Sequence, residues 1–348
     1  MTSKSFNIGN VSIGQGKCFI IGEIAQSHDG SLGMAHAYVD AVANAGADAV
    51  KFQTHIADAE SSPDEPWRVK FSRQDKTRFD YWKRMEFEAS QWKGLKEHAE
   101  DRGLIFLSSP FSIEGIDLLQ NLGIQGWKVA SGEINNALLL KHLAKTNKPV
   151  MLSSGMSTME EIDSAIEILA DADVPYSVMQ CTSLYPTPPE KTGLHLIKDL
   201  RHRYECPVGY SDHSGKVATG VAAVTLGAEI LEIHVTMSRE MFGPDVIASV
   251  TTNEFRELID GVRFVEKALS NPFKKDQSAY ELEDLRKIFT KSLFAASDIA
   301  AGQTIKMNDI NVKKPGTGIP VKYMDKIIGK RANKEILKGT MIKNEDII

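Results

Sequence analysis

Short apolar runs along the chain end, one after another, in side chains that bind anions, bind metals or transfer protons. Glu23 and Lys51 lie near the ends of the first two runs, and a middle run carries Lys128. His213 directly follows the seventh run, and the eighth run carries His234. Lysine ammonium groups with nearby hydroxyls and backbone N–H groups suit a phosphate or a carboxylate. Two imidazoles suit a divalent metal, which can polarise a carbonyl as a Lewis acid. These residue types therefore predict that an anionic substrate binds beside a carbonyl compound.

A repeating framework must position these side chains. Eight apolar runs with many β-branched and aromatic residues alternate with segments of helical period. The runs that predict strands are 18–24, 48–53, 104–110, 126–131, 149–155, 176–183, 206–212 and 229–236. The helical segments include 34–46, 114–123, 159–172, 216–228 and 253–270. Eight strand–helix units predict a TIM (β/α)8 barrel. A doubly wound open sheet is the alternative, although it usually has fewer strands.

Two further segments accompany the predicted barrel. Residues 6–14 read as a hairpin with Gly9 and Asn10 in the turn, ahead of the first barrel strand. The connection 54–88 is unusually long for a strand-to-helix link. Long insertions of this kind are often functional, so we expect this one to contribute to the site.

The C-terminal region contains an internal near-repeat. Residues 298–310 match residues 335–347 at a constant offset, so that Ile299 corresponds to Ile336. This repeat predicts a small, pseudo-symmetric, β-rich domain, with the loop 311–320 between its two halves. A domain of this size has a thin core, and we expect it to lean on the barrel or on another subunit. The predicted organisation is a barrel with its N-terminal hairpin at 1–270, a charged linker at 271–292 and the small domain at 293–348.

Composition limits the classes of function. The net charge of −5 gives no basic footprint for nucleic acid. The three cysteines, Cys18, Cys181 and Cys206, are widely spaced and read as reduced thiols. The N-terminal stretch lacks the apolar core of a signal peptide, and no apolar run is long enough to span a bilayer. We therefore expect a cytoplasmic protein without a nucleic-acid or membrane partner.

In TIM barrels the chemistry lies at the C-terminal ends of the strands. In this chain, the polar residues at these positions are Glu23, Lys51, Gln53, Ser108, Ser109, Lys128, Ser131, Glu133, Ser153, Ser154, Thr182, Ser183, Tyr185, Tyr210, Ser211, Asp212, His213, Glu232 and His234. A single serine before a helix is often only an N-cap. Polar side chains at all eight strand ends instead predict an active site at one mouth.

Two pairs of these residues have more specific readings. His213 and His234 end the adjacent seventh and eighth strands, so their imidazoles can converge on one metal, for which Mn²⁺, Fe²⁺, Zn²⁺ and Co²⁺ all remain open. Glu23 and Glu133 are candidates for proton transfer, and the alternative for each is an ion pair with a lysine.

Several motifs resemble one known family. The segments GEIAQSHDGS, ADAVKFQTH, SSPFS, KVASGEINN, LSSGM, CTSLYPTP, GYSDHS and GPD occur in the order seen in the N-acetylneuraminate (sialic acid) synthase family. That family includes legionaminic and pseudaminic acid synthases and proteins similar to spore coat polysaccharide synthases. The C-terminal segment resembles the family's antifreeze-like (SAF) domain, and the resemblance covers nearly the whole chain.

The resemblance implies an activity and an assembly. The implied reaction condenses phosphoenolpyruvate with an open-chain N-acyl hexosamine, such as N-acetylmannosamine, to give a nine-carbon 2-keto-3-deoxy acid and phosphate. Other members use 2,4-diacetamido-trideoxy sugars. The implied assembly is a homodimer in which the antifreeze-like domain of one chain covers the barrel mouth of the other.

The resemblance also implies a role for individual residues. His213 and His234 match the positions that bind the divalent metal, Mn²⁺ or Mg²⁺, and Glu23 and Glu133 match the acidic pair near the reacting carbons. The positions that match the phosphoenolpyruvate site are Lys51, Gln53, Ser109, Lys128, Ser131, Ser153, Ser183 and Ser211. The positions that match sugar contacts are Tyr185, Asp245 and Lys314.

Three departures from the family pattern concern the choice of sugar. The first motif reads QSHDGS rather than NHNG or NHEG, and the segment 61–87 does not read like the loop that touches the sugar. Lys314 stands where sialic acid synthases have an arginine. Lysine keeps the charge but loses the planar fork of five donors.

Two other functions are compatible with parts of this pattern. One is a related synthase or aldolase acting on a phosphorylated aldose, against which the antifreeze-like segment argues. The other is a non-catalytic sugar-binding protein that has kept the fold. The intact set of glutamate, lysine and histidine residues argues against this second alternative.

Overall fold

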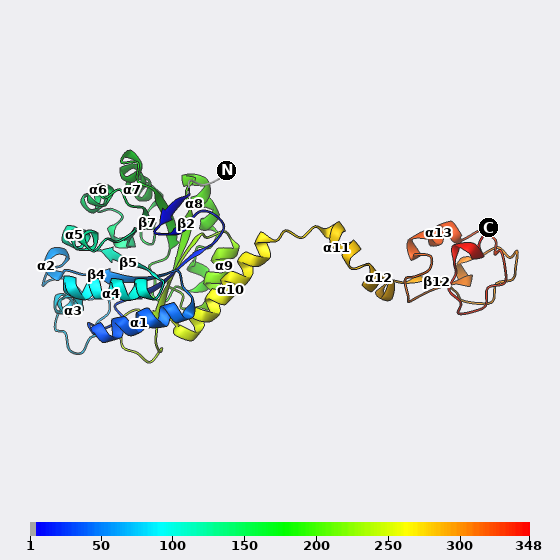
Figure 1. Cartoon of the computed structure of the whole chain (residues 1–348), viewed down its shortest axis with the longest axis horizontal. Helices are drawn as coiled ribbons and strands as arrows, with labels where there is room; N and C mark the ends of the chain where they lie inside the picture. Colours follow the sequence, from blue (N-terminus) through cyan, green and yellow to red (C-terminus); the bar gives the residue numbers. More distant parts are fainter. Residues whose placement is uncertain (1–4) are drawn as a thin grey trace. The chain divides into compact units, whose positions relative to one another are not determined.

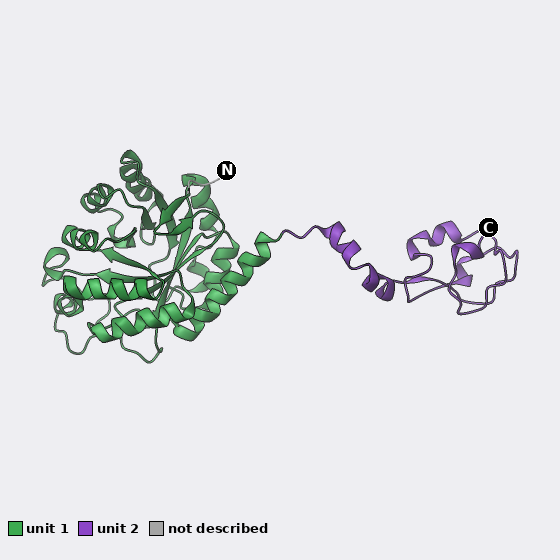
Figure 2. Cartoon of the chain, in the orientation of Figure 1, with its two compact units in different colours: residues 1–271 green, residues 272–348 purple. Residues whose placement is uncertain are grey.

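The computed structural model describes residues 5–348, which form two compact units, one ending at Asn271 and the other beginning at Pro272 (Figure 2). Residues 1–4 lie outside the described residues. They belong to the predicted barrel domain and to the N-terminal stretch that was expected to lack a signal peptide. Within the described part of the chain, none of the helices combines the length and apolar character that crossing a membrane requires.

The first unit contains the predicted parallel barrel (Figure 1). Its eight strands are β3 (Phe19–Ala25), β4 (Ala49–Thr54), β5 (Ile105–Pro110), β6 (Trp127–Val129), β7 (Val150–Ser153), β8 (Tyr176–Cys181), β9 (Val208–Asp212) and β10 (Ile230–Thr236). They pair in the order β5-β4-β3-β10-β9-β8-β7-β6, and β5 lies beside β6 where the barrel closes. All eight coincide with predicted runs, so the barrel prediction is confirmed.

Helices surround this barrel, and their apolar faces cover the strands. They are α1 (Leu32–Ala45), α2 (Ala57–Glu60), α3 (Arg78–Met85), α4 (Ala89–Asp101), α5 (Ile113–Asn121), α6 (Ala137–Ala144), α7 (Met159–Asp171), α8 (Leu196–Tyr204), α9 (Val217–Thr225) and α10 (Thr252–Ser270). A short strand, β11 (Val250–Thr251), pairs with the end of β10. In α1, for example, Tyr38, Val39 and Val42 recur at helical spacing and are fully buried in the main core.

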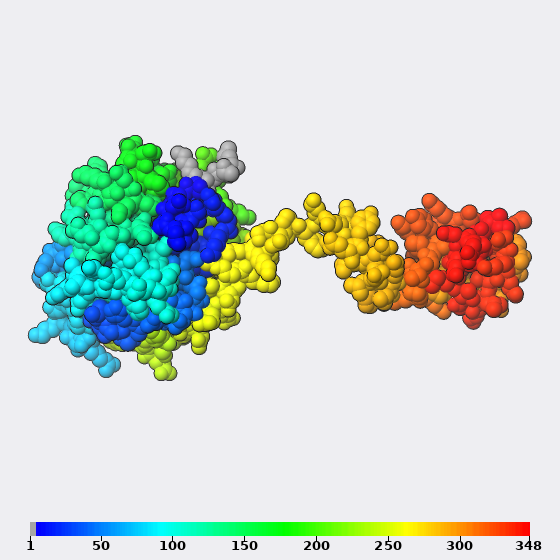
Figure 3. All heavy atoms as spheres, in the orientation of Figure 1, coloured from blue at the N-terminus to red at the C-terminus, as the bar shows by residue number. Residues whose placement is uncertain are grey.

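The predicted hairpin closes the N-terminal end of the barrel. Strands β1 (Phe6–Ile8) and β2 (Val11–Ile13) pair antiparallel around the Gly9–Asn10 turn. Ile8 and Ile13 are fully buried among inward-facing strand residues such as Met151. The blue atoms of the hairpin form part of the surface of the first unit in Figure 3. The apolar residues therefore fill one end of the barrel and leave its polar residues to the other end.

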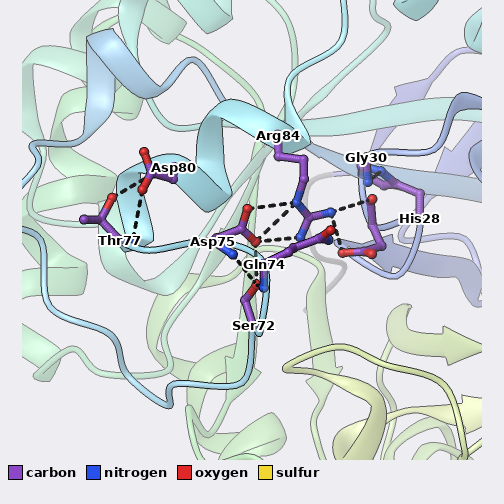
Figure 4. Close-up of polar contacts among 9 residues, drawn as sticks. His28, Gly30, Ser72, Gln74, Asp75, Thr77, Asp80 and Arg84 are labelled. Atoms are coloured by element: carbon purple, nitrogen blue, oxygen red, sulfur yellow. Dashed lines mark hydrogen bonds and ion pairs between the residues drawn. The ribbon is translucent and has the colours of Figure 1, made fainter.

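The insertion between β4 and α4 is fastened to the turn that follows β3 (Figure 4). Arg84, on α3, donates to both carboxylate oxygens of Asp75 and, at 2.8 Å, to the main-chain and side-chain oxygens of Asp29. Gly30 is needed in that turn, because it has a φ of 77° and a side chain there would collide with the main-chain oxygen of Arg84. Residues far apart in the sequence thus hold the insertion beside the barrel mouth.

The second unit begins with α11 (Lys275–Glu281) and α12 (Glu283–Phe289), followed by β12 (Ser292–Ala295), β13 (Ile310–Lys313) and α13 (Met324–Ile327). The predicted near-repeat forms a pseudo-symmetric pair: Ile299 and Ile336 exchange main-chain hydrogen bonds of 2.9 Å. The loop between the two halves is anchored as well. Ser292 Oγ donates to the main-chain oxygen of Pro315 at 2.7 Å and accepts from the amide of Gly318 at 2.8 Å.

Candidate active site

Two lysines and two glutamates form a buried charge cluster at the C-terminal end of the barrel. Lys51 Nζ lies 2.7 Å from Glu23 Oε2 and 3.8 Å from Glu232 Oε2. Lys128 Nζ lies 3.4 Å from Glu232 Oε1. Strand register produces this cluster, because Glu23 pairs with Lys51 on β4 and with His234 on β10. Glu23 thus forms an ion pair with a lysine, which the sequence offered as the alternative to a role in proton transfer.

Burial and neighbouring charge act against each other in this cluster. Burial would lower the pKa of the Lys51 ammonium, but the carboxylates of Glu23 and Glu232 raise it above its usual value. Burial raises the pKa of Glu23 to about 7, even though Lys51 opposes the shift. Burial also lowers the pKa of Lys128. Lys51 is therefore a charged anchor, whereas the Glu23 carboxyl holds or releases a proton near neutral pH.

The two predicted metal ligands lie close together, with imidazole centres 5.2 Å apart. His213 Nδ1 donates to the main-chain oxygen of Thr182 at 2.8 Å, which leaves Nε2 as an acceptor facing the Tyr185 hydroxyl at 3.0 Å. His234 Nδ1 is buried without a hydrogen-bond partner. Burial lowers the pKa of both imidazoles to about 3, so both are neutral and can donate a lone pair to a cation.

Hydroxyl groups surround the charge cluster. Lys51 Nζ donates to Ser109 Oγ at 3.2 Å, and the hydroxyls of Ser131 and Ser183 lie 3.0 Å apart. Ser211 Oγ donates to Glu232 Oε1 at 3.1 Å. Ser153 Oγ is buried and has no partner. Buried polar atoms are normally paired, so this hydroxyl is available to a polar ligand.

A chain of amides and an imidazole connects this cluster to the insertion. Gln53 Nε2 donates to Glu23 Oε1 at 3.1 Å, and Gln53 Oε1 accepts from Gln26 Nε2 at 3.1 Å and from His55 Nε2 at 3.3 Å. His55 Nδ1 bonds to Glu60, at the end of α2. The orientation of the Glu23 carboxylate thus depends on residues of the insertion.

The site consists of two adjoining cavities, an inner one of about 50 Å³ and an outer one of about 400 Å³. The inner cavity is lined by these predicted residues: Glu23, Lys51, Gln53, Ser109, Lys128, Ser131, Ser153, Tyr185, Ser211, His213 and His234. Ser183, Glu133 and Asp245 line the outer cavity, while Gln53, Ser131 and Tyr185 line both. Lys314 belongs to the second unit, where its Nζ lies 5.1 Å from the ring centre of Phe289.

Some site residues had no assigned role in the sequence reading. Glu232 stood among the strand ends, and its position two residues before His234 on one strand could have shown that both face the cavity. Gln26, His55, Glu60 and Arg68 line the outer cavity from loops and the insertion, where no periodic pattern marks an inward side chain.

Comparison with known proteins identifies the family. The family model described as the NeuB family matches residues 38–274, and the SAF domain model matches residues 290–348. The chain belongs to the NeuB family. The predicted barrel with a C-terminal SAF domain is therefore confirmed, as is the resemblance that the motifs indicated.

Relatives in the NeuB family extend over nearly the whole chain. N,N'-diacetyllegionaminic acid synthase of Campylobacter jejuni is 33% identical over 94% of this chain and 99% of its own length. N-acetylneuraminate-9-phosphate synthase of Mus musculus is 33% identical, with 96% and 92% covered. The crystal structure of N-acetylneuraminic acid synthetase from Leptospira borgpetersenii, in complex with citrate, is 30% identical, has a TM-score of 0.72 and covers 81% of this chain and 97% of its own.

The imidazole pair fits a metal that is also bound by ligands from outside the protein. Among residues 5–348, no group of three histidine, cysteine or acidic side chains is placed to hold a metal ion. Two neutral imidazoles, one with an unpartnered buried nitrogen, nevertheless fit a cation that keeps open positions for oxygen ligands. This arrangement, in a NeuB-family barrel, is compatible with His213 and His234 as metal ligands.

Proposed function

We propose that this chain is a nonulosonic (sialic) acid synthase. The reaction joins C3 of phosphoenolpyruvate to the aldehyde carbon of an open-chain N-acyl hexosamine, consumes one water and releases phosphate. The product is a nine-carbon 2-keto-3-deoxy acid. The observation that carries this proposal is the position of two ammonium groups and several hydroxyls beside a neutral imidazole pair, in one mouth of a NeuB-family barrel.

Phosphoenolpyruvate would occupy the inner cavity. It carries a phosphate and a carboxylate, and the cavity offers Lys51 and Lys128 together with the hydroxyls of serines. The unpartnered Ser153 hydroxyl supports this placement, since it lacks an acceptor within the protein. Charge-assisted hydrogen bonds of this kind are about twice as strong as neutral ones. Gln53 would orient the Glu23 carboxylate next to the reacting carbons.

The proposed cofactor is Mn²⁺ or Mg²⁺, held by His213 and His234, which when bound would polarise the sugar aldehyde. Attack by C3 leaves the aldehyde oxygen to take up a proton and leaves C2 electron-deficient. Water then adds to C2 and loses one proton, and its second proton leaves with the phosphate as the C–O bond to phosphate breaks. Glu133 and Glu23 are the proposed proton carriers for these steps. Their pKa values are both raised by burial, which brings the two carboxyls closer to the pH at which proton transfer is efficient.

The alternative within this proposal concerns the sugar. A relative's name specifies diacetyllegionaminic acid, so a 2,4-diacetamido-2,4,6-trideoxyhexose is the second candidate acceptor. We also propose that Tyr185, Asp245 and, from the SAF domain of a partner chain in a homodimer, Lys314 contact this sugar. The resemblance in the motifs supports these assignments.

The test measures phosphate released from phosphoenolpyruvate and Mn²⁺ with N-acetylmannosamine, its 6-phosphate and a diacetamido sugar. We expect turnover with at least one sugar, and about 10²-fold lower kcat for Glu133→Gln, in line with the loss of a general acid–base. His213→Ala should lose its response to added Mn²⁺. Absence of phosphate release with all of these sugars would contradict the proposed function.

A further inference from the structure

His55 occupies a buried position where the insertion meets the barrel mouth. Its ring centre lies 4.0 Å from that of Trp82, on α3, and 4.5 Å from that of Phe111, which follows β5, and both pairs are stacked. The His55 side chain is 3% exposed and lines the outer cavity together with Glu60. A ring stacked between two others keeps its plane, so its two nitrogens are held in fixed directions.

The hydrogen bonds around Gln53 determine which end of its amide faces His55. While Glu23 is ionised, its oxygens only accept, so the Gln53 group that contacts Glu23 Oε1 at 3.1 Å is the NH₂ group. The Gln53 oxygen therefore points the other way, where it accepts from Gln26 Nε2 at 3.1 Å and contacts His55 Nε2 at 3.3 Å. Because this oxygen only accepts, His55 Nε2 carries a proton.

The second nitrogen of His55 faces a carboxyl group. Nδ1 bonds to Glu60 Oε1, and this contact needs a hydrogen of its own. Glu60 Oε2 is buried without a hydrogen-bond partner, and among residues 5–348 no lysine or arginine pairs with this side chain. A buried carboxylate without a counter-charge is strongly disfavoured.

The shared proton belongs to the imidazole, for two reasons. Imidazole is a stronger base than a carboxylate. The electron-rich faces of Trp82 and Phe111, on either side of His55, also favour a cation between them.

We propose that His55 is held as an imidazolium by Glu60 and acts as a positioning residue for Gln53. Its Nε2 donates to one lone pair of the Gln53 oxygen, and Gln26 occupies the other. The Gln53 amide then cannot turn over without losing three hydrogen bonds, so its NH₂ group stays directed at the Glu23 carboxylate. The effect on catalysis rests on the proposed function, whereas the protonation of His55 does not.

NMR of the full chain, with isotope-labelled histidine ring nitrogens, measures the charge of His55 without any turnover. The sample contains Mg²⁺, since Mn²⁺ would broaden the signals, and His55→Gln assigns the signals of His55 by their loss. At neutral pH we expect both ring nitrogens to be protonated. In Glu60→Gln only Nε2 should remain protonated, because the new amide can donate to Nδ1. A single proton on the wild-type ring, or an imidazolium that persists in Glu60→Gln, would overturn the proposal.

Steady-state kinetics of phosphate release measure the positioning role. His55→Phe keeps a ring between Trp82 and Phe111 but removes both donors, and we expect kcat to fall about tenfold, as a small displacement of reacting groups would cause. KM for phosphoenolpyruvate should stay within about threefold of the wild-type value. His55→Gln restores a donor near the position of Nε2 and should recover most of the lost kcat. The matched control is His142→Phe, which removes a 2.8 Å contact with Asp117 between α6 and α5 and should leave kcat unchanged.

The outcomes distinguish this inference from the proposed function. Equal losses of kcat in His55→Phe and His55→Gln, a similar loss in His142→Phe, or a change confined to KM would overturn the positioning role. A merely structural role would impair both variants of His55 alike, whereas recovery with glutamine follows from the restored donor. If the wild-type chain turns over no sugar in the panel, the proposed function fails, and the NMR result still decides the protonation of His55.

Discussion

Glu133 differs from Glu23 and Glu232 in making no ion pair with a lysine among residues 5–348. Asn136 Nδ2 donates to Glu133 Oε2 at 2.9 Å. The alternative of an ion pair with a lysine is not met by Glu133, and Lys128 pairs with Glu232 instead. Burial raises the pKa of Glu133 from its usual 4.5, and the Asn136 hydrogen bond opposes that rise. If Glu133 accepts a proton, activity should fall as the pH drops through this raised pKa.

Asn136→Asp should shift this acid-side fall in activity, the acid limb of the pH profile, to higher pH. The aspartate keeps the side-chain oxygen that caps α6 by accepting from the Leu139 amide, but it replaces the donor with a negative charge. Both changes disfavour the Glu133 carboxylate, and we expect the limb in kcat/KM to shift upward by about one pH unit. The control is Asn135→Asp, whose amide donates to Glu161 instead. Equal shifts in the two variants would remove Glu133 as the titrating group.

The residues whose proximity the sequence could predict are those whose position follows from strand register. Glu23, Lys51 and His234 lie side by side because neighbouring parallel strands end at one edge. The pairing of Arg68 with Asp245 joins residues 177 positions apart, through two irregular segments. No periodicity in either segment specifies that contact, so it could be found only in the folded chain.

At the scale of elements, the insertion matters most, because it supplies half of the residues that line the outer cavity. The sequence indicated that residues 54–88 are functional but not how they are held. The structure shows that Arg84, on α3, holds the insertion in place by hydrogen-bonding to Asp75 and to the turn after β3 (Figure 4). Burial raises the pKa of Asp75, but hydrogen bonds from Arg84 and Ser72 outweigh this effect and bring the pKa below its usual 3.8. The stability that the Asp75 carboxylate contributes is therefore fully present above its usual pKa of 3.8, and it is lost as the pH falls through the lowered pKa of the folded state.

Arg84→Lys should loosen the insertion without unfolding the barrel. Lysine keeps the charge but lacks the planar five-donor fork with which Arg84 bonds to Asp75 and Asp29 at once. We expect unfolding free energy to fall by about 1–2 kcal/mol, given the usual worth of hydrogen bonds between charged groups. Proteolysis within residues 61–77 should become faster, and KM for the sugar should rise more than KM for phosphoenolpyruvate. Arg102→Lys, which alters a pair with Asp40 at the end of α4, is the control. A similar loss in both variants would contradict a specific fastening role.

At the scale of the whole molecule, the pseudo-symmetry of the second unit defines the loop that carries Lys314. Each half of the repeat bonds to the other: Ile305 donates its amide to Lys330, and Ile342 donates its amide to Leu293, at 2.8 and 2.9 Å. The loop is stiffened further where Gly316 donates its amide to the main-chain oxygen of Lys287 at 2.7 Å. A side chain at position 316 would collide with Thr290, so only glycine permits this approach. Lys314 is thus presented from a firmly held loop.

A homodimer in which this loop serves the partner's barrel predicts complementation between two impaired chains. Glu133→Gln impairs the barrel, and Lys314→Glu impairs the SAF loop by placing a negative charge where we propose a sugar contact. When the two chains are co-expressed with different tags, the mixed dimer holds one barrel with both defects and one intact site. We expect about half the wild-type phosphate release at limiting sugar, since one of two symmetry-related sites is complete. If each loop served its own barrel, every site would carry one defect, and the mixed dimer would be no more active than the average of the two parent dimers.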